Sequence, residues 1–412
     1  MTRSEVPAWG TRGQDADSDD TLWEFIDLAE YRSPQTPAAR AARGRWAALK
    51  RLLWVGNDAG KAPTKAEADL CGLPRHRLET LVRPIDWMAG ALALDRSLAQ
   101  RTHAGSVSFV VGPPHGSLAD LLRCWAAGHG APEVEAPTYD EILAGGRSWL
   151  AAWPSGAESW VLPRLEHCWL RHAGGLGPVR QLLERALSGE LGPGLIGCDS
   201  WAWSYLRHVA PIVTTGAVTL QAFDGRRLAR LFRSLAAEGD AARLRFCDAR
   251  TGSLVLSIDG EDDGAGGMEL QQLAARARGN PAIARELWRA RLRSEPEGGE
   301  ESAKAVEGAD DDPSARETVW VSGLRDNPEL PPRLDEETTL VLHALLLHNG
   351  LTAQILAELL PVHRFRVQAV LLELAAAGII ARDGVERWRV TPPGYASVRT
   401  LLRGLGFLTD TL

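Results

Sequence analysis

The chain has 412 residues, of which 45% are hydrophobic and 24% are charged, and it carries a formal net charge of -7 at pH 7. This length and composition indicate a globular protein of several domains, because single domains usually run about 100 to 200 residues. The negative charge excludes a uniformly basic nucleic-acid coat, and no apolar run approaches the roughly 20 residues that a transmembrane helix needs.

The first 21 residues are polar and acidic, so we expect them to be disordered and to contain no secretory signal. The five cysteines are scattered and never form a Cys-x-x-Cys pair, which indicates neither a disulfide framework nor a thiolate metal site. We therefore expect a cytoplasmic protein with reduced thiols and no metal centre.

Residues 22–100 are predicted to be mainly helical. Trp46, Leu49 and Leu53 recur at helical spacing within "ARGRWAALKRLLWV", and the basic residues of this segment suit an anionic membrane surface or an acidic partner. Further on, Gly72 stands where the turn of a helix-turn-helix would lie, although an ordinary helical hairpin gives the same pattern. The arginines that follow this turn are candidate contacts to DNA or to a protein partner: Arg75, Arg77 and Arg83.

Residues 101–224 alternate short apolar runs with helical stretches. The runs are "SVSFVV", "PEVEA", "SWVLPRL", "GLIGCD" and "AVTLQAF". Runs that are apolar throughout, with helices between them, indicate a parallel sheet that is covered on both faces. We therefore predict a three-layer α/β core in this part of the chain.

Three further parts follow the core. Residues 225–293 are predicted to form a helical lid in which "RLRFCDARTGSLVLSIDG" is a β-hairpin insertion. Residues 294–330 are predicted to be a linker, because the stretch 294–317 carries nine acidic and two basic residues and almost nothing to bury. Residues 331–412 contain three helical segments and then "IIARDGVERWRV", two strands around an Asp-Gly turn, which we interpret as a winged helix.

The predicted winged helix offers a second candidate contact surface. Its recognition helix presents Arg364, Arg366 and Gln368, and its wing presents Arg387 and Arg389. Residues 333–412 contain eight arginines and eight acidic residues, whereas dedicated DNA readers usually carry a basic surface. Contact with DNA and contact with a protein are therefore both open.

The segment "VVGPPHGS" resembles a strand end that enters a phosphate-binding loop. Such a loop binds phosphates through backbone N–H groups, a helix N-terminus, a lysine and a Ser/Thr hydroxyl that holds Mg²⁺. Here Leu118 stands at the lysine position and Ala119 at the hydroxyl position, and no lysine occurs between residues 66 and 303. Pro163 and Arg164 stand where a later strand would end in two acids. We therefore predict that the protein does not hydrolyse ATP, and we assign no catalytic residue.

Taken together, these segments resemble the AAA+/STAND class of P-loop ATPases with a C-terminal winged helix, over roughly residues 85–412. In this resemblance "GLIGCDS" ends in a sensor residue, Asp199 or Ser200, and "ARGNPAIARELW" contains the lid motif GxP, whose proline the family places against adenine. The resemblance implies these nucleotide-binding residues: Gly112, Pro113, Pro114, His115, Gly116, Ser117, Asp199, Ser200, Gly279, Asn280 and Pro281. It also implies that ATP or ADP binds without being hydrolysed, if a nucleotide binds at all.

The predicted fold class is α/β, with a three-layer P-loop NTPase-like parallel sheet, a helical lid, an N-terminal helical region and a C-terminal winged-helix domain. The favoured function is an inactive ATPase homologue that acts as a regulatory scaffold or a nucleotide-sensing switch. It would contact a protein partner through its winged helix and N-terminal helices. The alternatives are a DNA-binding transcriptional regulator and an ATPase completed by the residues of a partner subunit in an oligomer.

Overall fold

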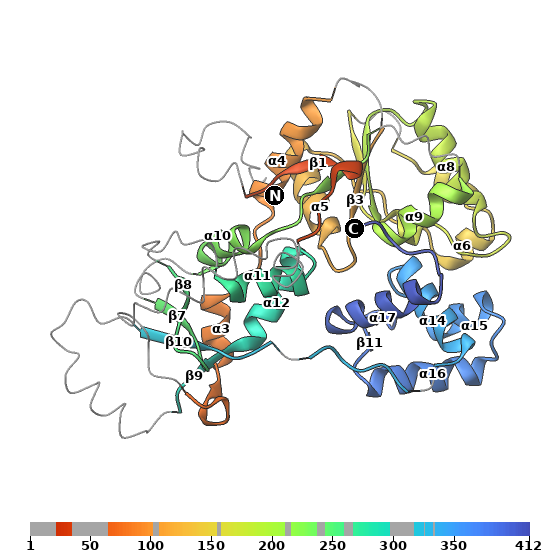
Figure 1. Ribbon diagram of the computed structural model, residues 1–412. Helices are drawn as coiled ribbons and strands as arrows, with labels where there is room; N and C mark the ends of the chain where they lie inside the picture. The colour runs from red at the N-terminus through yellow and green to blue at the C-terminus, as the bar shows by residue number, and fades with distance from the viewer. Residues whose placement is uncertain are drawn as a thin grey trace, which may run out of the picture. The chain divides into compact units, whose positions relative to one another are not determined.

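The computed structural model describes residues 22–34, 65–101, 107–154, 158–210, 216–236, 244–258, 267–296, 317–324, 326–332 and 334–412. The chain divides into two compact units (Figure 1). The first comprises Met1–Tyr31, Asp86–Gln221 and Asn327–Leu412, and the second comprises Arg32–Ile85 and Ala222–Asp326. The predictions of disorder in residues 1–21 and of a helix around Trp46 fall outside the described residues. Among the described helices, none is long and apolar enough to cross a membrane.

The first unit is built on a five-stranded sheet with the order β1-β6-β3-β5-β4. Its strands are β1 (Phe25–Asp27), β3 (Val107–Gly112), β4 (Trp160–Leu162), β5 (Gly194–Asp199) and β6 (Val218–Leu220). β3 pairs in parallel with β5 and β6, and β4 pairs in parallel with β5. Only β1, at one edge of this sheet, pairs antiparallel, with β6.

Helices cover both faces of this sheet (Figure 1). The helices of this part of the chain are η1 (Leu28–Glu30), α4 (Met88–Ala99), α5 (Leu118–His129), α6 (Tyr139–Leu143), α7 (Arg147–Ala151), η3 (Leu165–His167), α8 (Gly177–Leu187) and α9 (Ser200–Val209). Because successive side chains of a strand point to opposite faces, Val110 joins the apolar cluster under α4 and α5. Its neighbours Phe109 and Val111 join the cluster under α8 and α9. These three layers are the predicted P-loop NTPase-like α/β fold.

Two details of the sheet differ from the sequence prediction. The run "PEVEA" contributes only an isolated parallel bridge between Glu133 and Val161. Conversely, β1 lies in a segment that was predicted to be helical, and Phe25 pairs there with Leu220. The partner that makes this segment a strand is remote in the sequence, so local periodicity gives no sign of it.

The C-terminal segment, Asn327–Leu412, belongs to the first unit. Its elements are α14 (Glu336–Leu347), α15 (Ala353–Leu359), α16 (Arg364–Ala376), β11 (Ile380–Arg382), β12 (Trp388–Val390) and α17 (Pro392–Gly404). The three helices and the antiparallel β11–β12 hairpin follow each other in the predicted order. The turn is longer than the predicted Asp-Gly pair, since Asp383 accepts hydrogen bonds from the N–H groups of Val385 and Arg387 at 3.0 and 2.9 Å.

Apolar side chains join the C-terminal segment to the α/β core, Asp86–Gln221. Ile142, Leu170 and Trp201 of the core are buried in the cluster that α14, α15 and α16 form. In return, Leu347 and Leu412 of the C-terminal segment are buried in the cluster under α8 and α9. Separating the two parts would expose this surface to water, so apolar burial holds them together.

The second unit contains a five-stranded sheet with the order β2-β9-β10-β7-β8. Its strands are β2 (Cys71–Gly72), β7 (Leu244–Asp248), β8 (Leu254–Ser257), β9 (Leu292–Ser294) and β10 (Glu317–Val321). Its helices are η2 (Glu67–Asp69), α3 (Arg75–Leu81), α10 (Gly225–Leu235), α11 (Met268–Arg276) and α12 (Pro281–Arg291). β7 and β8 form the predicted antiparallel hairpin.

Two sequence predictions in the second unit are wrong. The helix-turn-helix around Gly72 is absent, because Gly72 is extended in β2 and pairs with Arg293 of β9. The predicted linker contains β10 and the last residue of β9, and Val319, Trp320 and Val321 are buried. The run "ETVWV" forms β10, but many acidic residues precede it. The average composition of the stretch therefore predicted a linker and gave no sign of a strand. The remainder of the acidic stretch, residues 297–316, lies outside the described residues.

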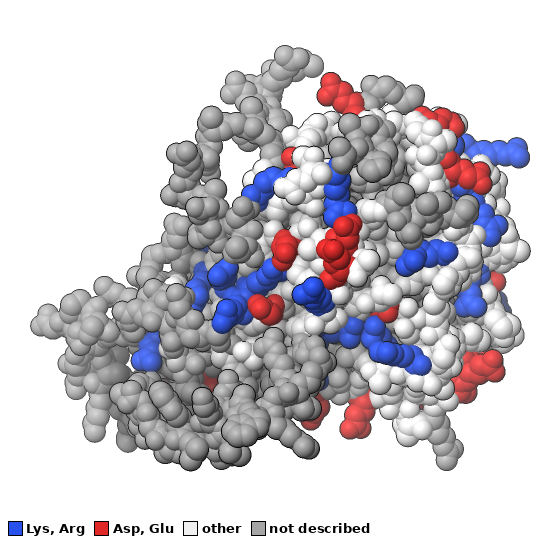
Figure 2. Space-filling model, turned by 45° about the horizontal axis from the view of Figure 1, so that its top comes forward, with Lys and Arg blue, Asp and Glu red and all other residues white. Residues whose placement is uncertain are grey.

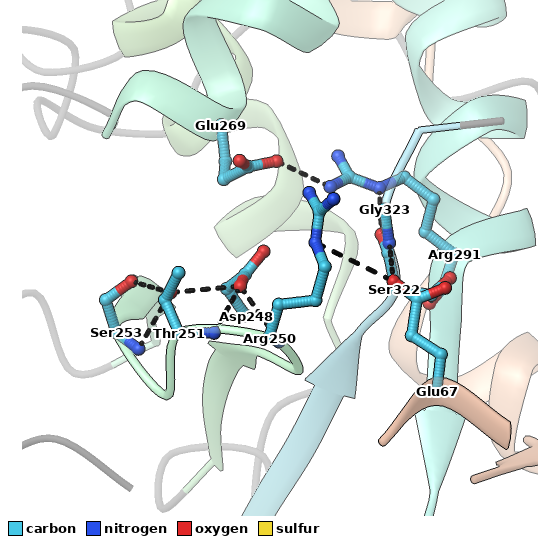
Figure 3. A network of polar contacts seen from close by, with 9 residues as sticks. All are labelled: Glu67, Asp248, Arg250, Thr251, Ser253, Glu269, Arg291, Ser322 and Gly323. Carbon is cyan, nitrogen blue, oxygen red and sulfur yellow. Dashed lines mark hydrogen bonds and ion pairs between the residues drawn. The ribbon is translucent and has the colours of Figure 1, made fainter. Parts of the chain in front are cut away.

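A network of polar contacts ties the turns of the second unit together (Figure 3). The carboxylate of Asp248 accepts hydrogen bonds from the backbone N–H groups of Arg250 and Thr251 at 3.0 and 2.8 Å, which closes the β7–β8 turn. The buried Arg291 guanidinium donates to the Ser322 carbonyl and to Glu269, both at 2.6 Å. These bonds connect the end of α12 to α11 and to the residue after β10.

A substitution at Gly197, in β5, tests how tightly the α/β core is packed. A Cβ atom at this position would lie 2.4 Å from Leu122 Cδ1 and 2.5 Å from the Pro163 carbonyl oxygen. We expect Gly197→Ala to lower the free energy of unfolding by about 1–3 kcal/mol, because overpacking a tight core forces the backbone to move. The measurement is urea unfolding followed by circular dichroism.

Gly177→Ala is the matched control for this substitution. Nothing lies within 4 Å of a Cβ atom at Gly177, the first residue of α8, and its φ is not in the left-handed region. Alanine is the better helix former, so this variant should be as stable as the parent or slightly more stable. Equal unfolding midpoints for the two variants would contradict the packing described for β5.

Candidate functional site

The candidate site lies at the carboxyl ends of β3 and β5. The parallel register of these strands places Gly112, the last residue of β3, beside Asp199, the last residue of β5. β3 lies between β6 and β5 in the sheet, and the chain leaves β3 for the side where β4 lies. Open α/β sheets bind ligands at such switch points, outside the carboxyl ends of the strands.

The β3–α5 loop, residues 113–117, has an unusual backbone. His115 and Ser117 have φ values of 61° and 53°, in the left-handed region that side chains with a Cβ atom seldom adopt. Gly116 separates them, and a Cβ atom there would lie 2.9 Å from the Pro113 carbonyl oxygen. Strained residues of this kind persist where the surrounding structure enforces them, and they are concentrated at functional sites.

The loop leads into α5 without a side-chain cap. Ser117 is the residue before the helix, and its side chain accepts no capping hydrogen bond. Within the described part of the chain, the backbone N–H groups of Ser117, Leu118 and Ala119 have no hydrogen-bond acceptor. Free N–H groups at a helix N-terminus attract anions, because the helix dipole adds a partial positive charge to them.

A pocket of about 240 Å³ opens over these N–H groups. It is lined by Gly112, Pro113, His115, Gly116, Ser117, Leu118, Ala119, Asp120, Pro163, Arg164, Glu166, Asp199, Asn349 and Arg389. The β3–α5 loop and α5 form one wall, and the residues after β4 and β5 form the next. The C-terminal segment completes the pocket with Asn349 and Arg389.

Leu118 occupies the position where a phosphate-binding loop carries its lysine. The Leu118 side chain packs against the apolar cluster under α4 and α5. It also lies so close to β3 that a Cβ atom on Gly112 would be 3.3 Å from it. Position 118 is therefore part of the apolar packing, and the pocket receives its positive charge from elsewhere.

Two arginines supply that charge from separate parts of the chain. Arg164 follows β4, and Arg389 belongs to β12, where it forms an ion pair with Asp383 at 3.1 Å. Burial lowers the pKa of Arg389 from its ordinary value, and the charges of Arg164 and Arg387 act in the same direction. The three guanidinium groups therefore repel one another, and a bound anion would relieve this repulsion.

Two buried carboxyl groups line the pocket. Glu166 and Asp199 are 4% and 5% exposed, and the Asp199 N–H donates to Glu166 Oε2 at 3.1 Å. Burial raises the pKa of both groups, and for Asp199 the neighbouring Glu166 adds to the increase. Asp199 also accepts a hydrogen bond from the Trp201 N–H at 2.9 Å, which begins α9. Raised pKa values reduce the negative charge that the pair presents to an anion.

His115, which lines the pocket, and His167, which contacts Arg387, are neutral histidines. Burial lowers the pKa of His115 to about 4, and the charge of Arg389 contributes. The His167 pKa is lowered well below its ordinary value by burial and by Arg387, whose Nη1 lies 3.2 Å from His167 Nδ1. At neutral pH these imidazoles are therefore uncharged hydrogen-bonding groups.

Two more histidines lie where the C-terminal segment meets the α/β core. His343 Nδ1 faces the Arg171 guanidinium at 3.3 Å, and its Nε2 faces the Leu408 carbonyl oxygen at 3.2 Å. This geometry fits an imidazole with a proton on Nε2 only, since a proton on Nδ1 would face the guanidinium. Burial and Arg171 lower the pKa of His343 to about 4, and burial lowers the pKa of His348 to about 3.

The structure brings part of the predicted nucleotide site together. Gly112, Pro113, His115, Gly116, Ser117 and Asp199 all line the pocket, whereas Pro114 and Ser200 do not. Ser200 is buried, and its hydroxyl donates to Asp410 at 2.8 Å. Gly279, Asn280 and Pro281 belong to the second unit. There the left-handed Gly279 lies in the turn between α11 and α12, and the Asn280 side chain caps α12 by accepting from the N–H groups of Ala282 and Ile283.

Most of the predicted DNA or partner contacts are engaged within the protein. Arg75 and Arg77 form ion pairs with Glu79 and Glu317. Arg83 donates to the carbonyl oxygens of Leu235 and Ala236.

The same holds for the candidate contacts of the C-terminal segment. Arg366 pairs with Asp335 and Glu337, Arg387 contacts His167, and Arg389 lines the pocket. Arg364 lies over the Phe365 ring at 4.8 Å, and Gln368 is exposed.

Sequence reasoning missed the two residues that the C-terminal segment contributes. Arg389 was predicted to face DNA or a partner, and nothing in the sequence marks Asn349. Two contacts bring Asn349 and Arg389 to the pocket. Leu351 pairs with Trp388, and the β11–β12 hairpin packs beside η3, where Arg387 contacts His167. These contacts join residues that are far apart in sequence, so no local spacing identifies them. Among the described residues, no group of three or more acidic, histidine or cysteine side chains is arranged to hold a metal ion.

No family model and no curated protein match this chain. The solved structures that it is similar to include the Aeropyrum pernix ORC2 protein, in a structure titled for its ADPNP and ADP complexes, with 12% identity and a TM-score of 0.26. That similarity covers 85% of this chain and 97% of that one.

Two further solved structures are similar to this chain. One is a single-residue variant of Thermotoga maritima RuvB, with 16% identity, a TM-score of 0.28 and coverage of 84% and 99% of the two chains. The other is a Walker-type ATPase of Pyrococcus abyssi, with 13% identity, a TM-score of 0.23 and coverage of 82% and 98%. These values are too low to carry any property over to this chain.

The lowered pKa values of the buried histidines predict how the free energy of unfolding depends on pH. His343 and His348 have pKa values of about 4 and about 3 in the folded protein, whereas an unfolded chain has a value near 6.5. Between these values the unfolded state binds more protons, so the folded state loses stability as the pH falls below 6.5. We expect each histidine to contribute about 1.4 kcal/mol of loss per pH unit between pH 6 and pH 4.5. Urea unfolding at several pH values measures this slope.

His343→Gln separates this contribution from that of the carboxyl pair. Glutamine keeps one donor and one acceptor but does not titrate, so the variant should show a shallower slope than the parent protein. Glu166 and Asp199 act in the opposite direction, because their raised pKa values favour the folded state as the pH falls, and they act equally in both proteins. Identical slopes would contradict the neutral state assigned to His343.

Proposed function

We propose that this protein is a P-loop ATPase-like protein that does not hydrolyse ATP and acts as a regulatory switch. The ligand is the phosphate group of a nucleotide or of a similar anion, and it binds in the pocket over the β3–α5 loop. The C-terminal segment closes this pocket and carries the signal to a protein partner.

One observation carries the proposal: Arg389 of the C-terminal segment and Arg164 of the α/β core line the same pocket as the N–H groups of α5. Arginine binds phosphate through two parallel N–H donors, so two such side chains hold an anion firmly. A ligand that contacts both Arg164 and Arg389 joins the C-terminal segment to the core. It thereby favours the state in which the two are docked.

The residues present fit a phosphate group but do not fit its hydrolysis. The first turn of α5 and the two arginines supply donors to phosphate oxygens. However, Leu118 and Ala119 supply neither a lysine nor a hydroxyl, and Pro163 and Arg164 replace the pair of acids that supports Mg²⁺ and polarises water. Those groups stabilise the transition state of phosphoryl transfer, so their replacement supports binding without turnover.

Thermal unfolding with added ligand tests the binding step. Inorganic pyrophosphate, ADP and ATP would each be titrated with and without Mg²⁺. We expect stabilisation that does not require Mg²⁺, reaching about 2.7 kcal/mol at 100 times the dissociation constant. Phosphate release from ATP should stay at the rate of the buffer alone. Turnover of ATP that falls when Gly116 is replaced would overturn the proposal, and so would the absence of any stabilisation.

Arg389→Gln tests the arginine that carries the proposal. Each hydrogen bond to a charged group contributes about 1.5–3 kcal/mol, so we expect pyrophosphate affinity to fall at least about tenfold. Arg403→Gln is the matched control, because Arg403 is exposed at the end of α17 and does not line the pocket. It should bind as the parent does. Equal affinities for the Arg389 variant and the parent would remove Arg389 from the site.

DNA binding remains the alternative function. On the face that Figure 2 shows, acidic and basic side chains of the described residues are interspersed. Most of the candidate contact arginines are already engaged within the protein, so we expect no retention of duplex DNA at about 50 mM salt, measured by a mobility shift. Binding that weakens steeply with added salt would instead support the DNA-binding regulator, because salt competes with phosphate contacts.

A further inference from the structure

A buried polar cluster surrounds Asp410, near the last helix of the C-terminal segment. The Asp410 side chain is fully buried, and its Oδ1 pairs with Arg399 Nε of α17 at 2.7 Å. Its Oδ2 accepts hydrogen bonds from Ser200 Oγ at 2.8 Å and from the Tyr395 hydroxyl at 2.9 Å. Tyr395 in turn accepts a hydrogen bond from Trp201 Nε1 at 3.0 Å.

This cluster joins the two parts of the first unit. Ser200 and Trp201 belong to α9 of the α/β core, whereas Tyr395 and Arg399 belong to α17. Asp410 is satisfied only when both parts are in place, because its Oδ2 takes one hydrogen bond from each. A buried charge that loses one of its partners is strongly destabilised, so the cluster forms or opens as a whole.

The residues around Asp410 extend the same junction. The Leu408 carbonyl oxygen lies 3.2 Å from His343 Nε2, and Leu412 is buried among the apolar residues under α8 and α9. Residues 407–412, which we call the latch, therefore run from α17 across to the α/β core.

Two residues that contact the latch, Ser200 and Tyr395, also adjoin residues that line the pocket. Ser200 directly follows Asp199, which lines the pocket. The Tyr395 ring meets the ring of His115, another lining residue, edge to face with centroids 6.4 Å apart. Movement of the latch would therefore disturb both the end of β5 and the β3–α5 loop.

We propose that the latch is the intramolecular lock of the switch: through Asp410 it fastens the C-terminal segment on the α/β core and so completes the pocket. Release of the latch withdraws Arg389 and Asn349 from the loop. The regulatory coupling rests on the proposed function, whereas the fastening rests on the Asp410 contacts alone. A ligand that needs both parts binds more weakly in proportion to the loss of the docked state.

The amide of Arg171 reports docking directly. Its backbone N–H, in the α/β core, donates to His348 Nε2 of the C-terminal segment at 3.4 Å. Hydrogen exchange of the peptide covering residues 168–176 should accelerate by about tenfold or more in Asp410→Ala, because the partly buried Arg399 is left without its carboxylate. Exchange of β3, which pairs inside the sheet, should stay unchanged.

A milder variant and a control keep the test decisive if Asp410→Ala does not fold. Tyr395→Phe removes one hydroxyl of the cluster and should accelerate the same exchange by a smaller factor. Thr400→Ala removes a hydrogen bond that lies wholly within α17, from Thr400 Oγ1 to the Ala396 carbonyl, and should change nothing. Exchange at residues 168–176 that is unchanged in folded Asp410→Ala or in Tyr395→Phe would overturn the latch.

The same variants test the coupling with pyrophosphate as the probe. We expect its dissociation constant to rise in Asp410→Ala and Tyr395→Phe in the order of their exchange rates. Faster exchange with an unchanged pyrophosphate affinity would overturn the coupling. If the parent protein binds no pyrophosphate, the proposed function fails, and the exchange measurements without ligand still decide whether the latch fastens the two parts.

Discussion

The parallel pairing of β3 with β5 is the constraint on which the site depends. Its register places Gly112 level with Asp199, so one loop and one helix start side by side at the same edge of the sheet. Asp199 then caps α9, and the next residue, Ser200, meets Asp410. A shift of one residue in this pairing would turn every side chain of β5 to the opposite face and would separate these contacts.

Much of the first unit follows from its apolar runs, because a strand that is buried on both faces must be apolar throughout. The runs at β3, β4, β5 and β6 predicted the parallel sheet for this reason. β1, β2, β9 and β10 escaped prediction, since each becomes a strand only beside a partner that is remote in the sequence. The composition of residues 294–317 similarly hid "ETVWV", whose burial is decided by its pairing with β7.

The candidate site shows the same division between local and long-range information. The loss of the lysine and of the acid pair could be read directly, because a sequence motif has a fixed spacing. The replacement of the lost charge could not be read, because Arg389 arrives from the β11–β12 hairpin and Arg164 was recognised only as a missing acid. The sequence motif alone indicates a pocket without positive charge. In the structure Arg164 and Arg389 supply that charge, whereas the motif positions still lack the groups that support hydrolysis.

One part of the second unit, Ala222–Asp326, determines when the pocket can form, because it is synthesised between the α/β core and the C-terminal segment. Arg387 of the C-terminal segment contacts a histidine 220 residues earlier in the chain. A nascent chain therefore carries the β3–α5 loop for a long time before Arg389 and Asn349 emerge. During this interval Ile142, Leu170 and Trp201 lack the apolar side chains that cover them in the folded protein. The unfinished core therefore exposes an apolar surface to which chaperones and other nascent chains bind.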